Sequence, residues 1–153
     1  MASPNNVPTK RLASCNCLAL RQAARHVTQF YDQVLAPSGL RTTQFSVLAK
    51  LHHLGPMTIN NLAKDLVMDR TTLGRNILPL QRDGLIAAVR GTADRRSKEL
   101  HVTKAGEARL KSATELWAMA QGRFEAVFGA PRASALRAVL REVSAKKFLA
   151  RPT

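Results

Sequence analysis

Guanidinium, hydroxyl and amide side chains recur on one short predicted helix, and groups of these types bind the phosphates and base edges of DNA. The helix should begin at Asp69, whose carboxylate can accept from the free amides of the first turn, and end before Gly84. Its buried side is predicted by the helical spacing of Leu73, Ile77 and Leu80, which leaves basic side chains opposite. The alternative is an ordinary solvated face. The candidate DNA contacts on this helix are Arg70, Thr71, Thr72, Arg75, Asn76 and Arg82.

A second basic cluster follows at a predicted hairpin turn. Short apolar runs at 85–90 and 99–103 predict two strands, and GTADRRSK between them forms a charged turn. We expect the carboxylate of Asp94 to hold the guanidinium of Arg96 in a fixed orientation, which suits a narrow, negative minor groove. The alternative is an exposed basic hairpin without a partner. The candidate DNA contacts at the turn are Asp94, Arg95, Arg96 and Lys98.

The elements that would position these clusters follow from apolar spacing and from helix breakers. Helices are expected over 14–36, 44–54 and 104–128, with a shorter one after Thr58. A last helix after Pro131 should carry Leu136, Val139, Leu140, Val143 and Phe148. Pro79 should bend the basic helix near its middle. The pattern predicts a mainly α fold, with a disordered tail (1–10), a winged helix-turn-helix DNA-binding region (56–103) and a helical dimerisation region (11–55 and 104–153).

The segments DRTTLGRNILPLQRDGLI and DRRSKELHVTKAG together resemble the multiple antibiotic resistance regulator (MarR) family of bacterial repressors. The resemblance extends to the order of helices along the whole chain. It implies a homodimer that binds a pseudopalindromic operator in double-stranded DNA and is often released by a small molecule or an oxidant. We therefore expect a sequence-specific transcriptional regulator, and the resemblance implies that it acts as a repressor. The alternative is a non-specific nucleoid-type DNA-binding protein.

Composition favours a nucleic-acid partner. The chain has 24 Lys and Arg against 10 Asp and Glu, a formal charge of +14, which would draw in DNA through counterion release. No apolar run approaches the roughly 20 residues of a membrane span, and the N-terminus lacks the apolar core of a secretory signal. We expect a cytoplasmic protein without a membrane partner. The four histidines are scattered and the acids are dispersed, so neither catalysis, a metal site nor a cofactor is expected.

Cys15 and Cys17 are the only cysteines, and both lie near the start of the first long predicted helix. Three interpretations remain open: inert thiols in an apolar interface, a redox sensor, or a metal site. A metal site is disfavoured because residues i and i+2 of a helix point about 200° apart. For the sensor, Ser14 or Asn16 could be the N-cap, which would place Cys17 in the first turn near the free amides.

The first helix also has partial similarity to the organic hydroperoxide resistance regulators, a branch of the same family. Cys17 and Tyr31 match the reactive cysteine and one tyrosine of that branch, whereas Thr42 stands where a second tyrosine would fall. Arg21, one turn after Cys17, could supply positive charge instead. We expect a cleft between the helical and winged regions that takes a small aromatic ligand or an organic peroxide. Its expected lining is Cys17, Arg21, Tyr31, Phe45 and His52.

Overall fold

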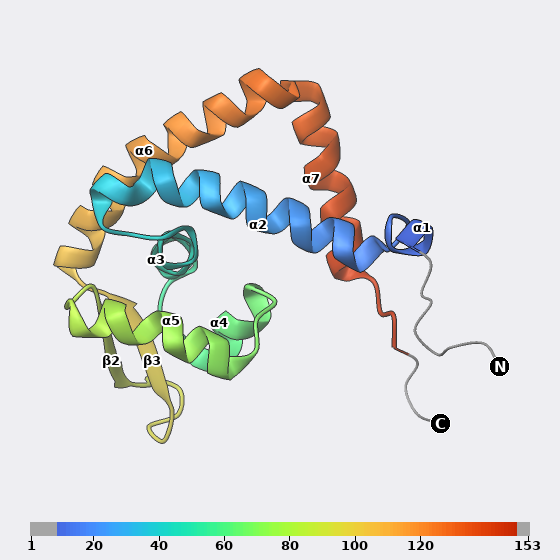
Figure 1. The fold of residues 1–153 in the computed structure, drawn as a ribbon. Helices are drawn as coiled ribbons and strands as arrows, with labels where there is room; N and C mark the ends of the chain where they lie inside the picture. The colour runs from blue at the N-terminus through green and yellow to red at the C-terminus, as the bar shows by residue number, and fades with distance from the viewer. Residues whose placement is uncertain (1–8, 150–153) are drawn as a thin grey trace.

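The computed structural model describes residues 9–149 and consists of helices arranged around one small sheet (Figure 1). The elements in chain order are α1 (Thr9–Leu12), α2 (Asn16–Leu35), the 3-10 turn η1 (Ala36–Ser38), α3 (Thr42–Leu54), β1 (Met57–Thr58), α4 (Ile59–Asp65), α5 (Arg70–Arg82), β2 (Ile86–Arg90), β3 (Lys98–Val102), α6 (Lys104–Phe128) and α7 (Ala130–Ala145). This is a winged helix-turn-helix fold extended by long helices at both ends of the chain.

The sheet is antiparallel with the strand order β1-β3-β2. Strands β2 and β3 form the wing, with Ile86 opposite Val102 at its base and Arg90 opposite Lys98 near its tip. The base of the hairpin is buried and its far end is exposed, because Ile86 and Leu100 pack into the core while the turn projects away from it. Figure 1 shows the hairpin extending beyond α5.

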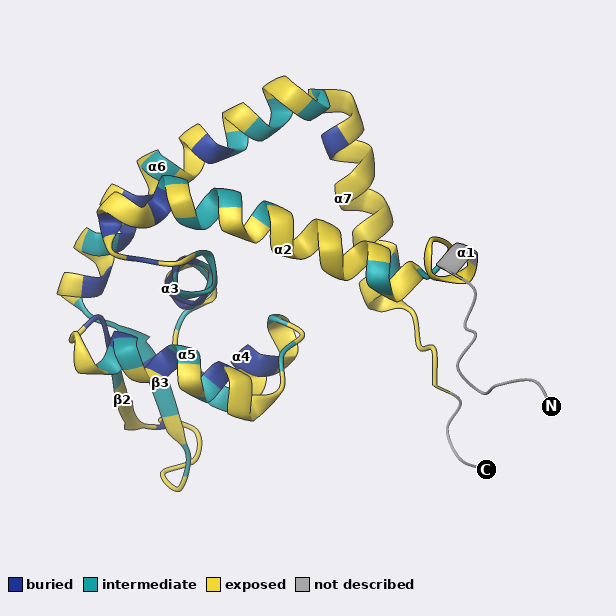
Figure 2. Ribbon diagram, viewed as in Figure 1, coloured by how far each residue is buried: buried dark blue, intermediate teal, exposed yellow. Residues whose placement is uncertain are grey.

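The main core lies among α3, α4, α5, the base of the sheet and the first half of α6 (Figure 2). Its largest fully buried side chains are Leu35, Val47, Leu48, Leu62, Leu73 and Leu80. Leu73, Ile77 and Leu80 are all buried, so the predicted apolar side of α5 is confirmed. Burying this stripe fixes the rotation of α5 and turns its polar side outward.

The long helices are packed much less completely. Helices α2 and α6 are in contact, and α6 turns back into α7 at Gly129. Of the described residues of α7, only Ala133 is buried. Figure 2 shows exposed residues along most of α2, the far half of α6 and α7. These helices therefore present much surface that the single chain does not cover.

Several boundaries differ from the sequence predictions. Residues 1–8 lie outside the described residues, but 9 and 10 belong to α1, so the expected disordered tail of 1–10 is too long by at least those two. Helix α7 ends at Ala145, which leaves Phe148 beyond the helix expected to carry it. Helix α5 continues through Pro79 to Arg82, so Pro79 does lie inside this helix, as the sequence indicated. The short strand β1 has no signal in the sequence strong enough to predict it.

Candidate nucleic-acid interface

Asp69 caps the N-terminus of α5 as expected. One of its carboxylate oxygens accepts from the backbone N–H of Thr72 at 2.8 Å, and the other accepts from the hydroxyl of Thr72 at 2.5 Å. The side-chain hydrogen bond from Thr72 is the main cause that lowers the pKa of Asp69, and the backbone bond adds to it. Thr72, one of the candidate DNA contacts, is thus engaged with Asp69 in forming the helix start.

The exposed side of α5 carries Thr71, Arg75, Leu78 and Arg82, so basic side chains do lie opposite the core stripe, as expected. Arg70 is also exposed at the first turn. Asn76 is more restrained, because its side-chain amide donates to the carbonyl oxygen of Thr72 at 2.9 Å. Arg70, Thr71 and Arg75 are therefore exposed toward a ligand, and Leu78 beside them is 64% exposed. The guanidinium Nε of Arg82 instead lies 3.4 Å from a carboxylate oxygen of Asp83.

The C-terminus of α5 is closed by a Schellman motif. Gly84 adopts a left-handed conformation with φ 70°, its N–H donates to Gln81, and the N–H of Leu85 donates to Leu80 at 2.9 Å. Gly84 is thus the helix-ending residue that the sequence predicted. The motif turns the chain directly into β2, which fixes the wing relative to α5.

This closed end is also bonded to the start of α6. The Thr103 hydroxyl donates to the carbonyl oxygen of Gly84 at 2.6 Å and accepts from the N–H of Gly106 at 3.0 Å. A Cβ atom at Gly106 would lie 2.1 Å from the carbonyl oxygen of Leu85, so only glycine fits there. The Thr-x-x-Gly segment therefore attaches α6 to the end of α5 and the beginning of β2.

The wing turn is ordered by a different contact from the one expected. Asp94 accepts a hydrogen bond from the backbone N–H of Arg96 at 2.9 Å, rather than holding the Arg96 guanidinium. The carbonyl oxygen of Asp94 also accepts from the hydroxyl of Ser97 at 2.8 Å. A Cβ at Gly91 would lie 2.5 Å from that hydroxyl oxygen, which makes glycine necessary in the turn. Asp94 therefore shapes the backbone on which Arg95, Arg96 and Lys98 are displayed.

A second set of contacts attaches α2 to α3. One carboxylate oxygen of Asp32 accepts from both the backbone N–H and the hydroxyl of Thr42, each at 2.7 Å. Arg109 of α6 donates to the carbonyl oxygen of Ser38 in η1 at 3.1 Å. Thr42, which replaces a tyrosine of the peroxide-sensing branch, thus serves to start α3. These contacts hold the start of α3, the helix that precedes the winged region, against the long helices.

The five expected effector residues do not share a cavity within the single chain. Cys17 and Tyr31 are 14 positions apart on one helix, which at 1.5 Å per residue is about 21 Å. Phe45 is buried and stacks on Trp117, with ring centroids 6.0 Å apart. His52 is exposed, and its Nδ1 lies 3.9 Å from a carboxylate oxygen of Glu107. The prediction that these five residues line one common cleft is therefore wrong for a single copy of the chain.

The two thiols differ in their surroundings. Cys15, not Ser14 or Asn16, is the N-cap of α2, and its Sγ accepts from the N–H of Leu18 at 3.4 Å. Cys17 is exposed in the first turn, as expected, and Arg21 is exposed one turn later. Both thiols are free. Within residues 9–149, no three His, Cys, Asp or Glu side chains gather as a metal site would require.

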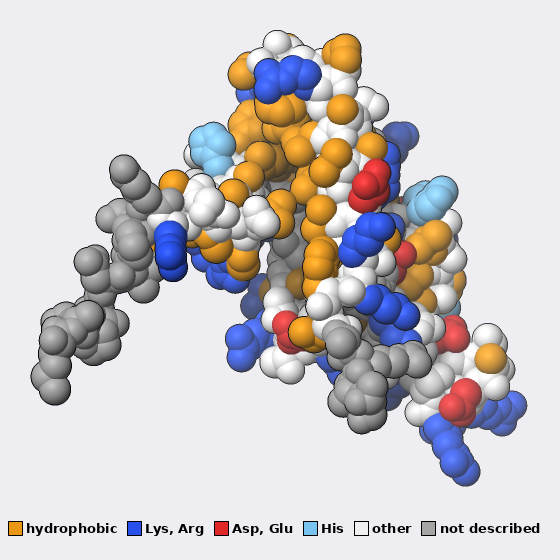
Figure 3. Space-filling view, turned by 90° about the vertical axis from the view of Figure 1, so that its right-hand side faces the viewer, with side chains coloured by type: hydrophobic (Ala, Val, Ile, Leu, Met, Phe, Trp, Pro, Cys, Tyr) orange, Lys and Arg blue, Asp and Glu red, His pale blue; other side chains and the backbone are white. Residues whose placement is uncertain are grey.

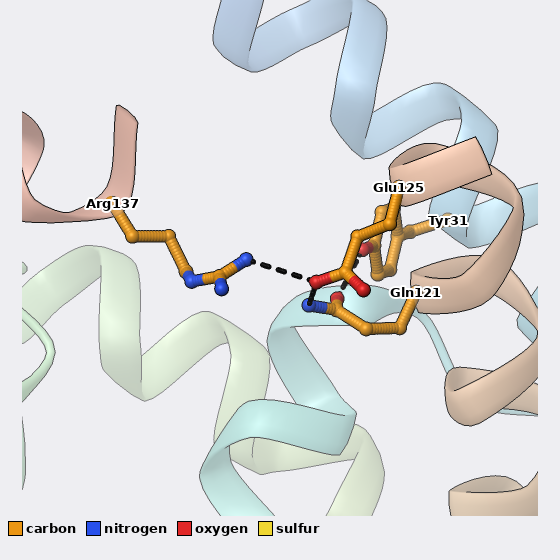
Figure 4. A network of polar contacts seen from close by, with 4 residues as sticks. All are labelled: Tyr31, Gln121, Glu125 and Arg137. Atoms are coloured by element: carbon orange, nitrogen blue, oxygen red, sulfur yellow. Dashed lines mark hydrogen bonds and ion pairs between the residues drawn. The ribbon is translucent and has the colours of Figure 1, made fainter. Parts of the chain in front are cut away.

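Tyr31 belongs instead to a polar network at the edge of an apolar groove (Figure 4). Its hydroxyl donates to Gln121 at 2.5 Å, Gln121 reaches Glu125 at 3.5 Å, and Glu125 pairs with Arg137 of α7 at 3.2 Å. Burial raises the pKa of Tyr31 and nearby Glu125 raises it further, so the phenol stays protonated and donates. The groove has a volume of about 740 Å³ and lies among α2, α6 and α7.

Some of these contributors carry no local sequence signal. Gln121, Glu125 and Arg137 resemble any exposed helix residues until the fold places α7 beside α6. Gly91 and Gly106 could have been suspected, because a glycine in a turn or at a helix start often allows a close approach.

No helix in the described part of the chain is long and apolar enough to cross a bilayer.

Known proteins resemble this chain in sequence and in structure. The MarR family model matches residues 40–98. The transcriptional regulator MosR of M. tuberculosis, solved in complex with DNA, is 39% identical, with 85% of this chain and 96% of that chain covered and a TM-score of 0.73. The transcriptional activatory protein BadR of Rhodopseudomonas palustris is 29% identical over 134 residues, which cover 84% of this chain and 73% of BadR.

A shorter match is to YwoH of Bacillus subtilis, an uncharacterized HTH-type transcriptional regulator, at 33% identity over 88 residues. The match covers 58% of this chain and 64% of the length of YwoH, so the chain spans less than two thirds of that relative. The likeness to MosR, by contrast, runs through both the winged region and the long helices. With its fold, its wing and this likeness, the chain belongs to the MarR family of DNA-binding transcriptional regulators.

Proposed function

We propose that the protein is a homodimeric repressor that recognises a pseudopalindromic operator. In this proposal α5 enters the major groove and the wing reaches the adjacent minor groove. The observation that carries it is the juxtaposition of two exposed basic clusters on one rigid unit, the outer side of α5 and the wing turn. Two such units at a fixed spacing are what a palindromic site requires.

The dimer is supported by the apolar surface of the long helices. Val127 is 91% exposed, Val139 is 55% exposed and Leu140 is 38% exposed in the single chain. Figure 3 shows hydrophobic side chains running down this face of the molecule from the junction of α6 and α7. Beside them lies the apolar groove lined by α2, α6 and α7. Burial of this surface against a second copy would remove it from water.

The DNA-binding part of the proposal is tested with duplexes selected by the protein from a random-sequence library. The wild type should prefer a selected duplex over a scrambled one by at least about 1000-fold. Arg75→Ala should cost about 1–3 kcal/mol and relax the base preference at its position. Lys146→Ala removes the same charge beyond the end of α7 and is the control. Equal affinity for selected and scrambled duplexes would instead favour a non-specific nucleoid-type protein.

The dimer is tested by analytical ultracentrifugation of Leu140→Glu. A carboxylate inside an apolar interface carries a large desolvation cost, so this variant should be monomeric and should lose operator affinity. Arg141→Ala, at the neighbouring exposed position, should remain dimeric. A wild-type protein that sediments as a monomer at the concentrations where it binds the operator would contradict the proposal.

The sign of regulation is tested in a reporter strain. A repressor should lower transcription from a promoter that overlaps the operator, whereas an increase would show activation, the role named for BadR.

Release by an oxidant rests on the free, exposed thiol of Cys17, and release by a small aromatic ligand rests on the apolar groove beside Tyr31. Operator affinity measured with an organic hydroperoxide, and separately with aromatic acids, distinguishes these two routes.

A further inference from the structure

Two of the eight glycines are not explained by the folded chain. Gly39, Gly55, Gly84 and Gly129 have positive φ angles, and Gly91 and Gly106 are approached too closely for a side chain. Gly74 and Gly122 have neither property, because a Cβ added to either would find nothing within 4 Å besides its chain neighbours and the nearby backbone of its own helix. Both lie inside helices, where glycine is less stable than alanine. The folded chain itself therefore gives no reason for the missing side chain at either position.

Gly74 lies in α5, one helical turn before Leu78. Leu78 is 64% exposed, although its neighbours Ile77 and Leu80 are almost fully buried. A single exposed leucine is ordinary on a protein surface. Here it stands among Thr71, Arg75 and Arg82, on the side of α5 that the core leaves free. Gly74 and Leu78 together form a shallow apolar patch between cationic side chains.

We propose that Gly74 and Leu78 accept the 5-methyl group of a thymine, and that residue 74 is glycine because the duplex approaches the α5 backbone there. Thymine is the one DNA base that presents a methyl group in the major groove. The surrounding guanidiniums favour a polyanion over an apolar protein partner. The inference rests on the proposed function, since it requires α5 to face the major groove.

The proposal predicts opposite effects of one substitution on folding and on DNA binding. Gly74→Ala should raise the melting temperature of the free protein by about 2–4 °C, because it removes the helix penalty of glycine. It should also weaken binding to the selected duplex by about tenfold. Gly74→Leu, a larger residue with good helix propensity, should weaken binding further. Unchanged or tighter DNA binding by both variants would overturn the proposal.

Gly122→Ala is the matched control, because it fills an equally open helical glycine in α6, outside the winged region. It should raise the melting temperature in the same way. Its operator affinity, measured where sedimentation shows the same oligomeric state as the wild type, should not change. Equal losses of affinity for Gly74→Ala and Gly122→Ala would show that the effect at Gly74 is not local to the DNA-facing side, and would overturn the proposal.

The base is identified by replacing thymines of the selected duplex with deoxyuridine, one position at a time. Deoxyuridine keeps the hydrogen-bonding edges and lacks only the methyl group. The wild type should lose about three- to fourfold in affinity at one position of each half-site. Leu78→Ala should bind more weakly overall and show no further loss at that position. A wild-type protein insensitive to every replacement would refute the methyl contact, while specific binding that depends on Arg75 would leave the proposed function standing.

Discussion

The hydroxyl of Thr103 joins two helices, because it donates to the carbonyl oxygen of Gly84 at the end of α5 and accepts from Gly106 in the first turn of α6. The backbone N–H of Thr103 also donates to the carbonyl oxygen of Leu85 at 3.1 Å. Helix α5 and the long helix α6 therefore meet at one residue with few degrees of freedom.

Thr103→Val keeps the shape of the side chain and loses both hydroxyl hydrogen bonds. The free energy of unfolding should fall by about 1–3 kcal/mol, because the Gly84 carbonyl and the Gly106 N–H lose their partner. Thr103→Ser should recover most of this loss. Urea denaturation followed by circular dichroism provides the measurement, and equal stability of the Val and Ser variants would contradict a role for the hydroxyl.

Asp94→Ala should weaken operator binding, although it makes the protein more positive. Removal of an acid should strengthen a purely electrostatic grip on phosphate. The opposite is expected here because Asp94 orders the wing turn through the N–H of Arg96. Asp94→Asn keeps an acceptor oxygen and should bind at least as well as the wild type. Fluorescence anisotropy at matched salt concentrations would decide, and tighter binding by Asp94→Ala would rule out the ordering role.

Cys17→Ser should bind the operator normally and no longer respond to an organic hydroperoxide, if the thiol controls DNA release. Cys17 is exposed, whereas the sulfur of Cys15 is engaged as the cap of α2. Oxidation of a thiol to a sulfenic acid transfers one peroxide oxygen to sulfur and releases an alcohol. Cys15→Ser should still respond. Wild-type affinity that is unchanged by the peroxide would assign Cys17 to packing only.

The Asp69 cap should make the stability of α5 depend on pH. The pKa of Asp69 is lowered in the folded chain, mainly by the hydrogen bond from the Thr72 side chain. Its contribution to stability is therefore present above the ordinary carboxyl pKa and is lost as the pH falls below about 4. Asp69→Asn can still cap the helix but does not titrate there. Thermal melts across the acidic range should show a shallower decline for Asp69→Asn than for the wild type.

Most of the winged region could be predicted from the sequence, because the signals that define its elements are local. The Asp69 cap, the apolar stripe of α5 and the glycine that ends the helix are each recognisable within a few residues. The long helix α6 likewise begins and ends where the breakers predicted. The resemblance to the MarR family was drawn from these same segments, and the fold agrees with it.

The contacts that sequence analysis missed depend on how distant segments meet. Asp94 was expected to bind the Arg96 side chain. The geometry of the turn instead places the backbone N–H of Arg96 against the Asp94 carboxylate. Tyr31 was assigned to a cleft with Cys17, but the length of α2 separates them, and Tyr31 meets Gln121, 90 positions away. Neither outcome can be read from residue types alone, because both depend on tertiary placement.

Helix α3 and the winged region that follows it form one unit that is held at two attachments. Thr103 and Gly106 attach the end of the winged region to α6, and the contacts of Asp32 with Thr42 and of Arg109 with Ser38 attach the start of α3 to α2 and α6. A segment restrained at both ends has little conformational entropy left to lose when it binds a ligand. The unit is thus preorganised, and its own backbone contributes little adaptability. Adjustment to DNA sites of different half-site spacing would then have to come from rotation of one whole chain against another.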